Sequence, residues 1–372
     1  LSKTDDFTNS FTDVKDTDAM RIKLFSGKTD AIKWILPEKS LVLGTTSAEF
    51  ALGSNRDDIA ITPSAFSLKQ KSAYGSSSVD PFIAKDNIFF FMRDGKTLRE
   101  WSFEYNTKNA TSNDLSYIAN HLLKSGVKDV TYQQQPNSII WIVTNDGDLV
   151  GLTYEKEYDT VAWHKHTFDG TVESVAILSE ENQEDYVYLS IKDSNNNRNI
   201  VKLDALDWGT DYTTEFAGLD FYKKYTGDNK TSLTGLDHLE GKTVTVLDGG
   251  LKLSSTYTVT SGSITIPSTD NTVYVGLLYT STLAPLYVDI QYSNGTTSGS
   301  KKAIQKATIR FKDTLSAKVG QTETDLDPVK FNSTTVLNNE DAEVWLSNAN
   351  EFLQTVYVLQ DEPNPCTVLA MV

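Results

Sequence analysis

The sequence has a single cysteine, no long hydrophobic run and no excess of positive charge. Cys366 is the one thiol among 372 residues, so the chain cannot form an internal disulfide. No apolar run approaches the roughly 20 residues that a membrane-spanning helix needs. A formal net charge of −16 repels phosphate backbones and argues against nucleic-acid binding through a basic patch, although it allows DNA to pass without sticking. Because no His lies near it in the sequence, we expect Cys366 to be a small buried hydrophobe rather than a nucleophile.

The sequence also lacks the usual signatures of catalysis. Gly-rich phosphate loops, the zinc-protease helix and the nucleophile elbow are missing. The run from Asp193 to Asn197 lacks the Gly and the final Glu of a calcium loop, which favours a hairpin tip. His164 and His166 would face the same side of a strand, but no third His or Cys lies nearby, so two exposed histidines are favoured over metal ligands. We therefore expect no enzymatic activity, no cofactor and no metal.

What the sequence does contain is a strand–turn–strand pattern that recurs about every fifty residues. Its anchors are separated by 55, 52 and 46 positions and are Trp34, Phe89, Trp141 and Val187. Asp94-Gly95 and Asp146-Gly147 lie between apolar runs, where a tight hairpin needs residues that tolerate positive φ. Strand-bearing repeats of this length indicate propeller blades.

The character of the sequence divides the chain into five expected segments. These are a polar arm (1–20), the propeller blades (21–204), a polar connection (205–234), a small antiparallel β-sandwich or barrel domain (235–325), and C-terminal strands that return to the propeller (326–372). Within 111–123 the apolar positions have helical spacing, and Thr111 with Asp114 resembles a capping box, so we expect one short helix between two blades. The predicted fold class is all-β, an irregular β-propeller with an additional small β domain.

Several segments, in order along the chain, resemble the tail nozzle or tail tubular protein B family of short-tailed bacteriophages. They are LVLGTTSAEF (41–50), ITPS (61–64) with QKSAYGS (70–76) and VDP (79–81), REWSF (99–103) with NDL (113–115) and ANHL (119–122), QP (135–136) through Trp141 to DGDL (146–149) with LTY (152–154) and AWH (162–164), and GLDHLEGKTV (235–244). Five groups in the family's order are fairly specific. Trp101 departs from the family, which usually has Tyr there. Family members are usually much longer, so the chain resembles the C-terminal part of one.

The resemblance implies a virion protein of the phage tail, made in the cytoplasm of the bacterial host. It implies a ring-shaped conduit for DNA ejection, with a hexamer in the virion, and it leaves open whether the isolated chain is a monomer. The implied partners are the tail adaptor, the tail fibres and genomic DNA that slides past an acidic wall. The family offers no catalytic residues. The matching positions that we single out as structural are Gly44, Glu49, Pro63, Tyr74, Gly75, Trp141, Gly147, His238, Glu240 and Gly241.

Two alternatives stay open in the sequence. His238 and Glu240 either lie at a subunit or domain boundary or form a hydrogen-bonded pair that fixes a turn, and the pair is favoured. The chain as a whole could instead be a carbohydrate- or receptor-binding β-propeller. In that reading the exposed aromatic residues Trp208, Tyr212, Tyr222 and Tyr225 would form a sugar platform.

Overall fold

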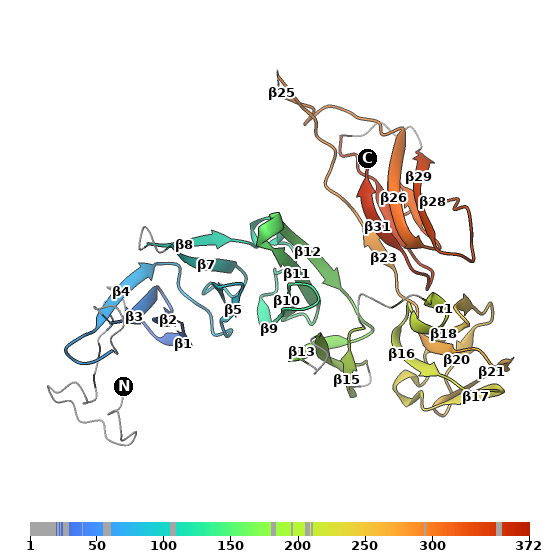
Figure 1. Cartoon of the computed structure of the whole chain (residues 1–372), viewed down its shortest axis with the longest axis horizontal. Coiled ribbons are helices and arrows are strands. Elements are labelled where there is room, and N and C mark those ends of the chain that lie inside the picture. Colours follow the sequence, from blue (N-terminus) through green and yellow to red (C-terminus); the bar gives the residue numbers. More distant parts are fainter. Residues whose placement is uncertain are drawn as a thin grey trace. The chain divides into compact units, whose positions relative to one another are not determined.

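The computed structural model describes residues 20, 22, 24, 30–38, 40–54, 61–104, 109–179, 184–194, 196–204, 209, 211–293, 295–346 and 352–372. Apart from its last residue, the predicted polar arm lies outside them. The chain divides into two compact units, Leu1–Leu203 and Asp204–Val372 (Figure 1). Almost all regular structure in the described residues is antiparallel β-sheet, which confirms the all-β class.

The described residues of the first unit form four consecutive antiparallel sheets, and in each sheet the strands lie side by side in chain order. Sheet A consists of β1 (Ile32–Pro37), β2 (Leu41–Thr45), β3 (Glu49–Gly53) and β4 (Ser67–Ser72). Sheet B consists of β5 (Phe82–Ala84), β6 (Asn87–Phe91), β7 (Leu98–Glu104) and β8 (Asn109–Asp114). Sheet C consists of β9 (Val127–Gln133), β10 (Ile139–Thr144), β11 (Leu149–Glu155) and β12 (Thr160–His166). Sheet D consists of β13 (Thr171–Ser179), β14 (Asp185–Lys192) and β15 (Arg198–Lys202).

The sheets correspond to the predicted repeat, with one displacement. Phe89, Trp141 and Val187 lie on the second strands of sheets B, C and D. Trp34 instead lies on β1, the first strand of sheet A, so the first copy of the repeat was placed one strand too early. The reason is that the β1–β2 hairpin also consists of an apolar strand, a polar turn and an apolar strand. The sequence pattern therefore cannot distinguish a hairpin of the first and second strands from one of the second and third strands.

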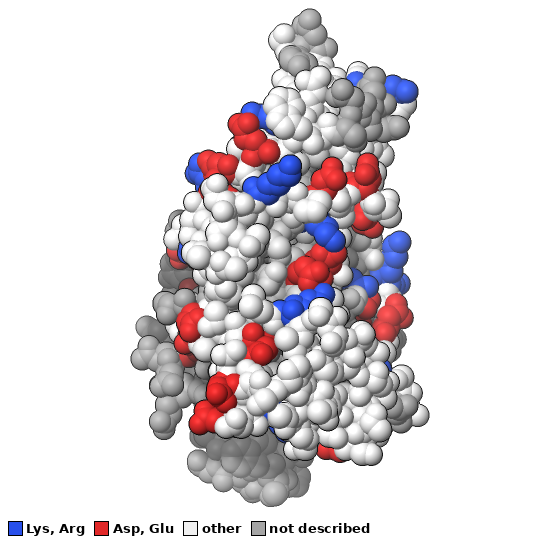
Figure 2. All heavy atoms as spheres, turned by 90° about the vertical axis from the view of Figure 1, so that its right-hand side faces the viewer, with Lys and Arg blue, Asp and Glu red and all other residues white. Residues whose placement is uncertain are grey.

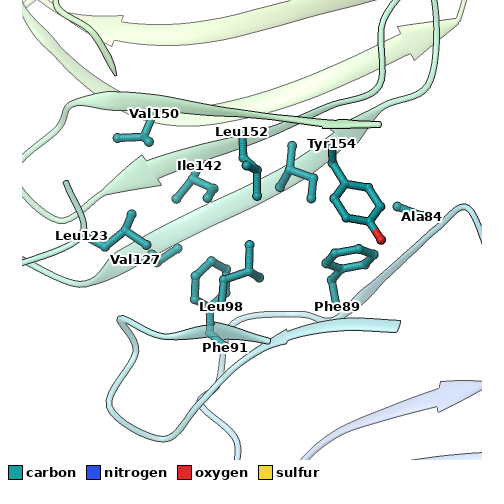
Figure 3. Packing of buried hydrophobic residues seen from close by; sticks show 11 residues of the cluster. Ala84, Phe89, Phe91, Leu98, Leu123, Val127, Ile142, Val150, Leu152 and Tyr154 are labelled. Carbon is teal, nitrogen blue, oxygen red and sulfur yellow. The ribbon is translucent and has the colours of Figure 1, made fainter. Parts of the chain in front are cut away.

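Sheet B is buried on both faces, as its strand β6 shows. All five residues of β6 are buried, and successive side chains point to opposite faces. Ile88 and Phe90 join a cluster with Trp34 of sheet A. Phe89 and Phe91 point toward sheet C, where they meet residues such as Ile142, Leu152 and Tyr154 (Figure 3). This double burial explains why β6 is a continuous apolar run rather than an alternating one.

The helix expected over 111–123 is not present. Residues 111–114 belong to β8 and pair with β7, and only a 3₁₀ turn, η1 (Tyr117–Ala119), follows. Asp114 Oδ1 accepts hydrogen bonds from the amide and hydroxyl of Ser116, so it forms a turn rather than a capping box. The helical spacing of the apolar residues led to a wrong prediction. Ala119 and Leu123 are buried although they lie in turns, and Ile118, which a helix would have buried with them, is 74% exposed. A second 3₁₀ turn, η2 (Lys156–Tyr158), separates β11 from β12.

The second unit begins with a group of short strands around one core. One sheet has the order β16-β22-β18-β19, and β20 also pairs with β18; a separate pair joins β17 and β21. Their bounds are β16 (Asp220–Tyr225), β17 (Lys230–Thr234), β18 (Thr243–Asp248), β19 (Leu251–Lys252), β20 (Tyr257–Thr258), β21 (Ser263–Thr269) and β22 (Val273–Leu277), with α1 (Tyr212–Glu215) and η3 (Asp237–Leu239) between strands. Apolar side chains from both sets of strands share a buried cluster.

Two further sheets complete the second unit, and their buried residues form a second cluster. One has the order β23-β30-β27-β28 and the other β29-β26-β31. Their bounds are β23 (Ser281–Leu283), β26 (Lys306–Thr314), β27 (Lys318–Gly320), β28 (Leu326–Pro328), β29 (Asn338–Trp345), β30 (Tyr357–Gln360) and β31 (Thr367–Met371); a small hairpin pairs β24 (Gln291–Tyr292) with β25 (Gly295–Thr296).

These pairings correct two of the predicted segments. The expected connection 205–234 contains β16 and β17, which pair with β22 and β21. The C-terminal strands expected to return to the propeller instead pair with strands of the second unit, β29 and β31 with β26 and β30 with β27 and β23. Local strand signals do not specify a partner, because pairing between distant strands is set by packing rather than by neighbouring residues.

Candidate functional site

One end of the first unit collects four of the ten positions singled out from the sequence, which are Glu49, Tyr74, Gly75 and Gly147. Because sheets A, B and C are four-stranded up-and-down meanders, the turn between the second and third strands of each lies at the same end as the connection to the next sheet. We call this region the turn end; it comprises residues 45–49, 73–81, 92–97, 115–126, 145–148 and 167–172. Glycine carbonyls there accept backbone hydrogen bonds from neighbouring turns or sheets, in the pairs Arg93–Gly75 (3.1 Å), Val127–Gly95 (2.8 Å), Asn145–Gly126 (2.9 Å) and Val172–Gly147 (2.9 Å).

Two of these glycines cannot carry a side chain. Gly75 has φ +76°, and a Cβ atom on it would lie 2.3 Å from the carbonyl oxygen of Thr46 in sheet A. Gly147 has φ +87°, and its Cβ would lie 2.7 Å from Cγ2 of Thr171 in sheet D. Both positions therefore need Gly for its left-handed backbone and for the close approach of another segment, Thr46 at Gly75 and Thr171 at Gly147. Sequence analysis singled out both residues, but it could not show which sheets they bring together.

Glu49 is a fully buried carboxylate at the start of β3. Its Oε1 accepts a hydrogen bond from Ser76 Oγ at 2.9 Å and its Oε2 from Ser72 Oγ at 2.5 Å. Burial raises the pKa of Glu49, while these bonds and those from the amides of Tyr74 and Gly75 act in the opposite direction. Glu49 thus holds the segment that leaves sheet A for sheet B.

Gly44 and Tyr74 complete this joint. Gly44 pairs with Trp34 across β1 and β2, and a Cβ on it would lie 2.1 Å from the indole ring. The guanidinium of Arg99, from sheet B, lies 3.5 Å from the centre of the Tyr74 ring. Four predicted positions, Gly44, Glu49, Tyr74 and Gly75, therefore meet where sheets A and B join. Pro63 lies apart from them, in the β3–β4 connection, which is closed by a bridge between residues 62 and 65.

A second buried carboxylate, Glu100, joins sheets B and C. It accepts hydrogen bonds from Tyr154 Oη of sheet C and from Lys156 Nζ of the turn η2, each at 2.7 Å, and from Asn87 Nδ2 at 2.8 Å. Burial disfavours the ionised carboxylate, but the bonds from Lys156 and Tyr154 outweigh it, so the pKa of Glu100 lies below its ordinary value. Sequence analysis did not detect this network, because Tyr154 and Lys156 lie 54 and 56 positions from Glu100.

Two aspartates connect sheets C and D in the same way. Asp129 Oδ2 accepts a hydrogen bond from the amide of Val175 at 3.1 Å. Asp185 Oδ2 accepts bonds from the amides of Gln134 and Gln135 at 2.8 and 3.0 Å. Each pair of adjacent sheets is thus joined by at least one carboxylate that accepts bonds from the neighbouring sheet or from the segment leading to it.

Trp141 lies on sheet C beside the two histidines of β12. Its Nε1 donates to Gln133 Oε1 at 2.9 Å, and its ring contacts both imidazoles. His164 and His166 are half-buried, so the expectation that they are exposed was wrong. Burial lowers the pKa of His164, and burial together with His164 lowers the pKa of His166 to about 4.

The predicted turn residues of the second unit lie in and next to η3. His238 Nε2 donates to the carbonyl of Phe221 at 2.8 Å, whereas Glu240 accepts from the amides of Ser261 and Gly262 at 2.9 and 2.7 Å. The expected His238–Glu240 pair is therefore wrong, since each side chain binds a different part of the backbone. Gly241 follows with φ +74°. The two residues are close in sequence, but the side chain of His238 binds the strand β16 and that of Glu240 binds the turn before β21.

Three of the four aromatic residues of the alternative sugar platform have internal partners. Tyr222 donates to Asp204 Oδ2 at 2.8 Å and packs against the Tyr274 ring, whereas Tyr225 donates to the carbonyl of Thr234 at 2.8 Å and packs on a different cluster. Tyr212 donates to the carbonyl of Thr335 at 2.8 Å. Trp208 lies outside the described residues. Tyr222 and Tyr225 therefore pack in different clusters.

Further features of the described residues concern metal ligands, membrane-spanning helices and thiol reactivity. Among them, no group of three or more His, Cys, Asp or Glu side chains could hold a metal ion, and no helix is long and apolar enough to cross a membrane. Cys366 is a free thiol that packs at the edge of the last cluster, where burial raises its pKa to about 11. At neutral pH it is therefore protonated, which agrees with the expected role as a small hydrophobe.

Comparisons with known proteins do not assign the chain to a family. No family model and no curated protein matches the chain. A solved structure from S. cerevisiae, of Dbp5 bound to Nup159, Gle1, IP6 and ADP, matches 88% of this chain and 75% of its own with 11% identity and a TM-score of 0.25. At so low a TM-score the match carries no argument about fold or function.

Proposed function

We propose that this chain is a structural component of a bacteriophage tail, a nozzle or tail tubular protein that forms part of a ring-shaped conduit for DNA ejection. The observation that carries the proposal is the location of the residues that resemble this family. Gly44, Glu49, Tyr74 and Gly75 come from two separate motifs and meet at one joint between sheets. Residues that hold sheets together are what a scaffold needs, whereas an enzyme would need polar groups that converge on a substrate.

The finer architecture belongs to the same proposal. The four sheets of the first unit are propeller blades, each packed face to face on the next, and further blades complete the ring of the propeller. The second unit contributes a β-sandwich. The chain works within a homo-hexamer in the virion, in contact with the adaptor and the tail fibres, and it has no catalytic activity.

The proposed channel requires an acidic surface along its wall. The net charge of −16 suits a wall that repels the phosphates of passing DNA. Acidic and basic side chains are intermingled on the face shown in Figure 2, with wide uncharged areas between them. Ion pairs on β26 and β29, such as Lys306–Glu343 and Arg310–Asp341, both at 2.7 Å, are of this mixed kind. A different face must therefore line the channel.

Particle imaging tests the function. The full-length protein, mixed with the adaptor of the phage that encodes it, should form six-fold rings whose lumen is lined by acidic side chains. Peptide mass spectrometry of purified virions should detect the chain. Absence of rings in the presence of the adaptor, or a neutral or basic lumen, would refute the conduit. Glycan binding by the isolated protein, lost in Trp208→Ala, would favour the alternative receptor-binding function.

A further inference from the structure

His164 and His166 form a compact pair of nitrogen ligands on β12. The strand β12 is at the edge of sheet C, and residues two apart on a strand point to the same face. Nδ1 of His164 lies 2.8 Å from Nε2 of His166, and the ring centres are 4.9 Å apart with the planes at 82°. In the metal-free protein one of the two nitrogens must carry the proton that the other accepts.

The distance between these two nitrogens suits one class of metal ion. Two ligand nitrogens at about 2.0 Å from a metal are about 2.8 Å apart when the angle between the bonds is a right angle, as in a square-planar site. The same bonds in a tetrahedral site would place the nitrogens about 3.3 Å apart. Square-planar coordination by nitrogen and oxygen is typical of Cu²⁺ and Ni²⁺, and Cu²⁺ forms the more stable complexes.

The surroundings hold the pair in this arrangement. The Trp141 ring contacts both imidazoles and is itself fixed by its bond to Gln133. A Cβ on Gly151, which pairs with His164, would lie 2.0 Å from the imidazole, so the absence of a side chain there makes room for the ring. The other ring nitrogen of His164, Nε2, lies 3.5 Å from Thr153 Oγ1, where a hydroxyl can orient the tautomer that leaves Nδ1 free to bind metal.

We propose that His164 and His166 form a chelating site for Cu²⁺, bound through Nδ1 of His164 and Nε2 of His166. Binding releases the proton shared by the two nitrogens. The described residues provide no third His, Cys, Asp or Glu ligand, so water or an external ligand completes the coordination. This site is independent of the proposed role in a phage tail. It would cross-link two positions of an edge strand and stabilise sheet C.

Calorimetric titration of the full chain with CuSO₄ near pH 7.5 tests the site, with a weak competing ligand such as glycine to suppress loose binding. We expect one saturable equivalent that is lost in His166→Ala and in His164→Ala. The other two histidines of the chain provide controls, because His121 is exposed and lies on a turn and His238 binds a backbone carbonyl. The variants His121→Ala and His238→Ala should bind Cu²⁺ as the unchanged protein does.

Electron paramagnetic resonance of the unchanged protein provides a second test that needs no variant. One equivalent of Cu²⁺ should give an axial spectrum with coupling to two imidazole nitrogens, and Zn²⁺ should compete weakly for the site. A spectrum without two-nitrogen coupling would overturn the proposal, as would a titration that the His164 and His166 variants leave unchanged. If an alanine variant fails to fold, His166→Gln, checked by circular dichroism, replaces it in the titration.

Discussion

Substitution of Gly147 by Ala should separate the strain within a turn from the packing of one sheet on the next. Gly95 is a matched control: both glycines follow Asp in a hairpin between second and third strands, both have positive φ, and both accept a backbone hydrogen bond from the next sheet. They differ in one respect. A Cβ on Gly95 meets nothing within 4 Å, whereas a Cβ on Gly147 would lie 2.7 Å from Cγ2 of Thr171.

The expected magnitudes follow from this difference. A left-handed backbone costs an L-residue about 1–2 kcal/mol, and both alanine variants should lose this much stability. Overpacking against Thr171 should cost Gly147→Ala a further ~1–3 kcal/mol, because Cβ and Cα of Thr171 are also within 3.2 Å and the strand must shift. Thr171→Ala in the Gly147→Ala background should recover part of the extra loss, since it removes the nearest atom.

Urea unfolding followed by tryptophan fluorescence is a suitable assay. Four of the six tryptophans, at positions 34, 101, 141 and 163, lie in the first unit and report mainly on it. Hydrogen exchange locates the effect, which for Gly147→Ala should appear as faster exchange in sheets C and D, and for Gly95→Ala in sheets B and C. Equal losses of stability in the two variants would show that sheet D does not pack on the 145–148 turn as described.

Three further changes test the buried carboxyl groups and their partners. Glu49→Gln should lower the free energy of unfolding by about 2–4 kcal/mol, because an amide cannot accept all the bonds that the carboxylate accepts. Glu38→Gln, at an exposed position, should change it little. Equal effects of the two substitutions in urea unfolding would contradict the role of Glu49. Tyr154→Phe should cost about 1–2 kcal/mol through the lost bond to a buried carboxylate, with Tyr158→Phe, which is 77% exposed, as the neutral control in thermal unfolding. Burial raises the pKa of Asp220 to about 6, so the folded state binds its proton more tightly than the unfolded state and loses stability as pH rises from about 4 to 6. Asp220→Asn should therefore stabilise the second unit by about 2 kcal/mol at pH 7 and by little at pH 4, and the same gain at both pH values would exclude ionisation as the cause.

The local signals of the sequence were enough for the class of fold, its repeat and its tight turns. Runs of β-branched and aromatic residues separated by Asp-Gly fix where strands end, because alternation and turn chemistry are properties of neighbouring residues. The requirement for Gly75 and Gly147 could likewise be suspected from turns that need positive φ. The same local signals failed for residues 111–123, where helical spacing arose from a strand followed by a turn.

The tertiary structure alone decided which distant residues meet. Glu100, Tyr154 and Lys156 form one network because sheets B and C pack face to face, and the C-terminal strands pair within the second unit because their apolar faces share its core. His164 and His166 show the division most directly. Their spacing of two predicts only a common side of a strand, whereas the separation of 2.8 Å between their nitrogens depends on the packing of Trp141 and on the space above Gly151. The sequence determines strands and turns because these depend on neighbouring residues, whereas the distances between functional side chains depend on how the sheets pack.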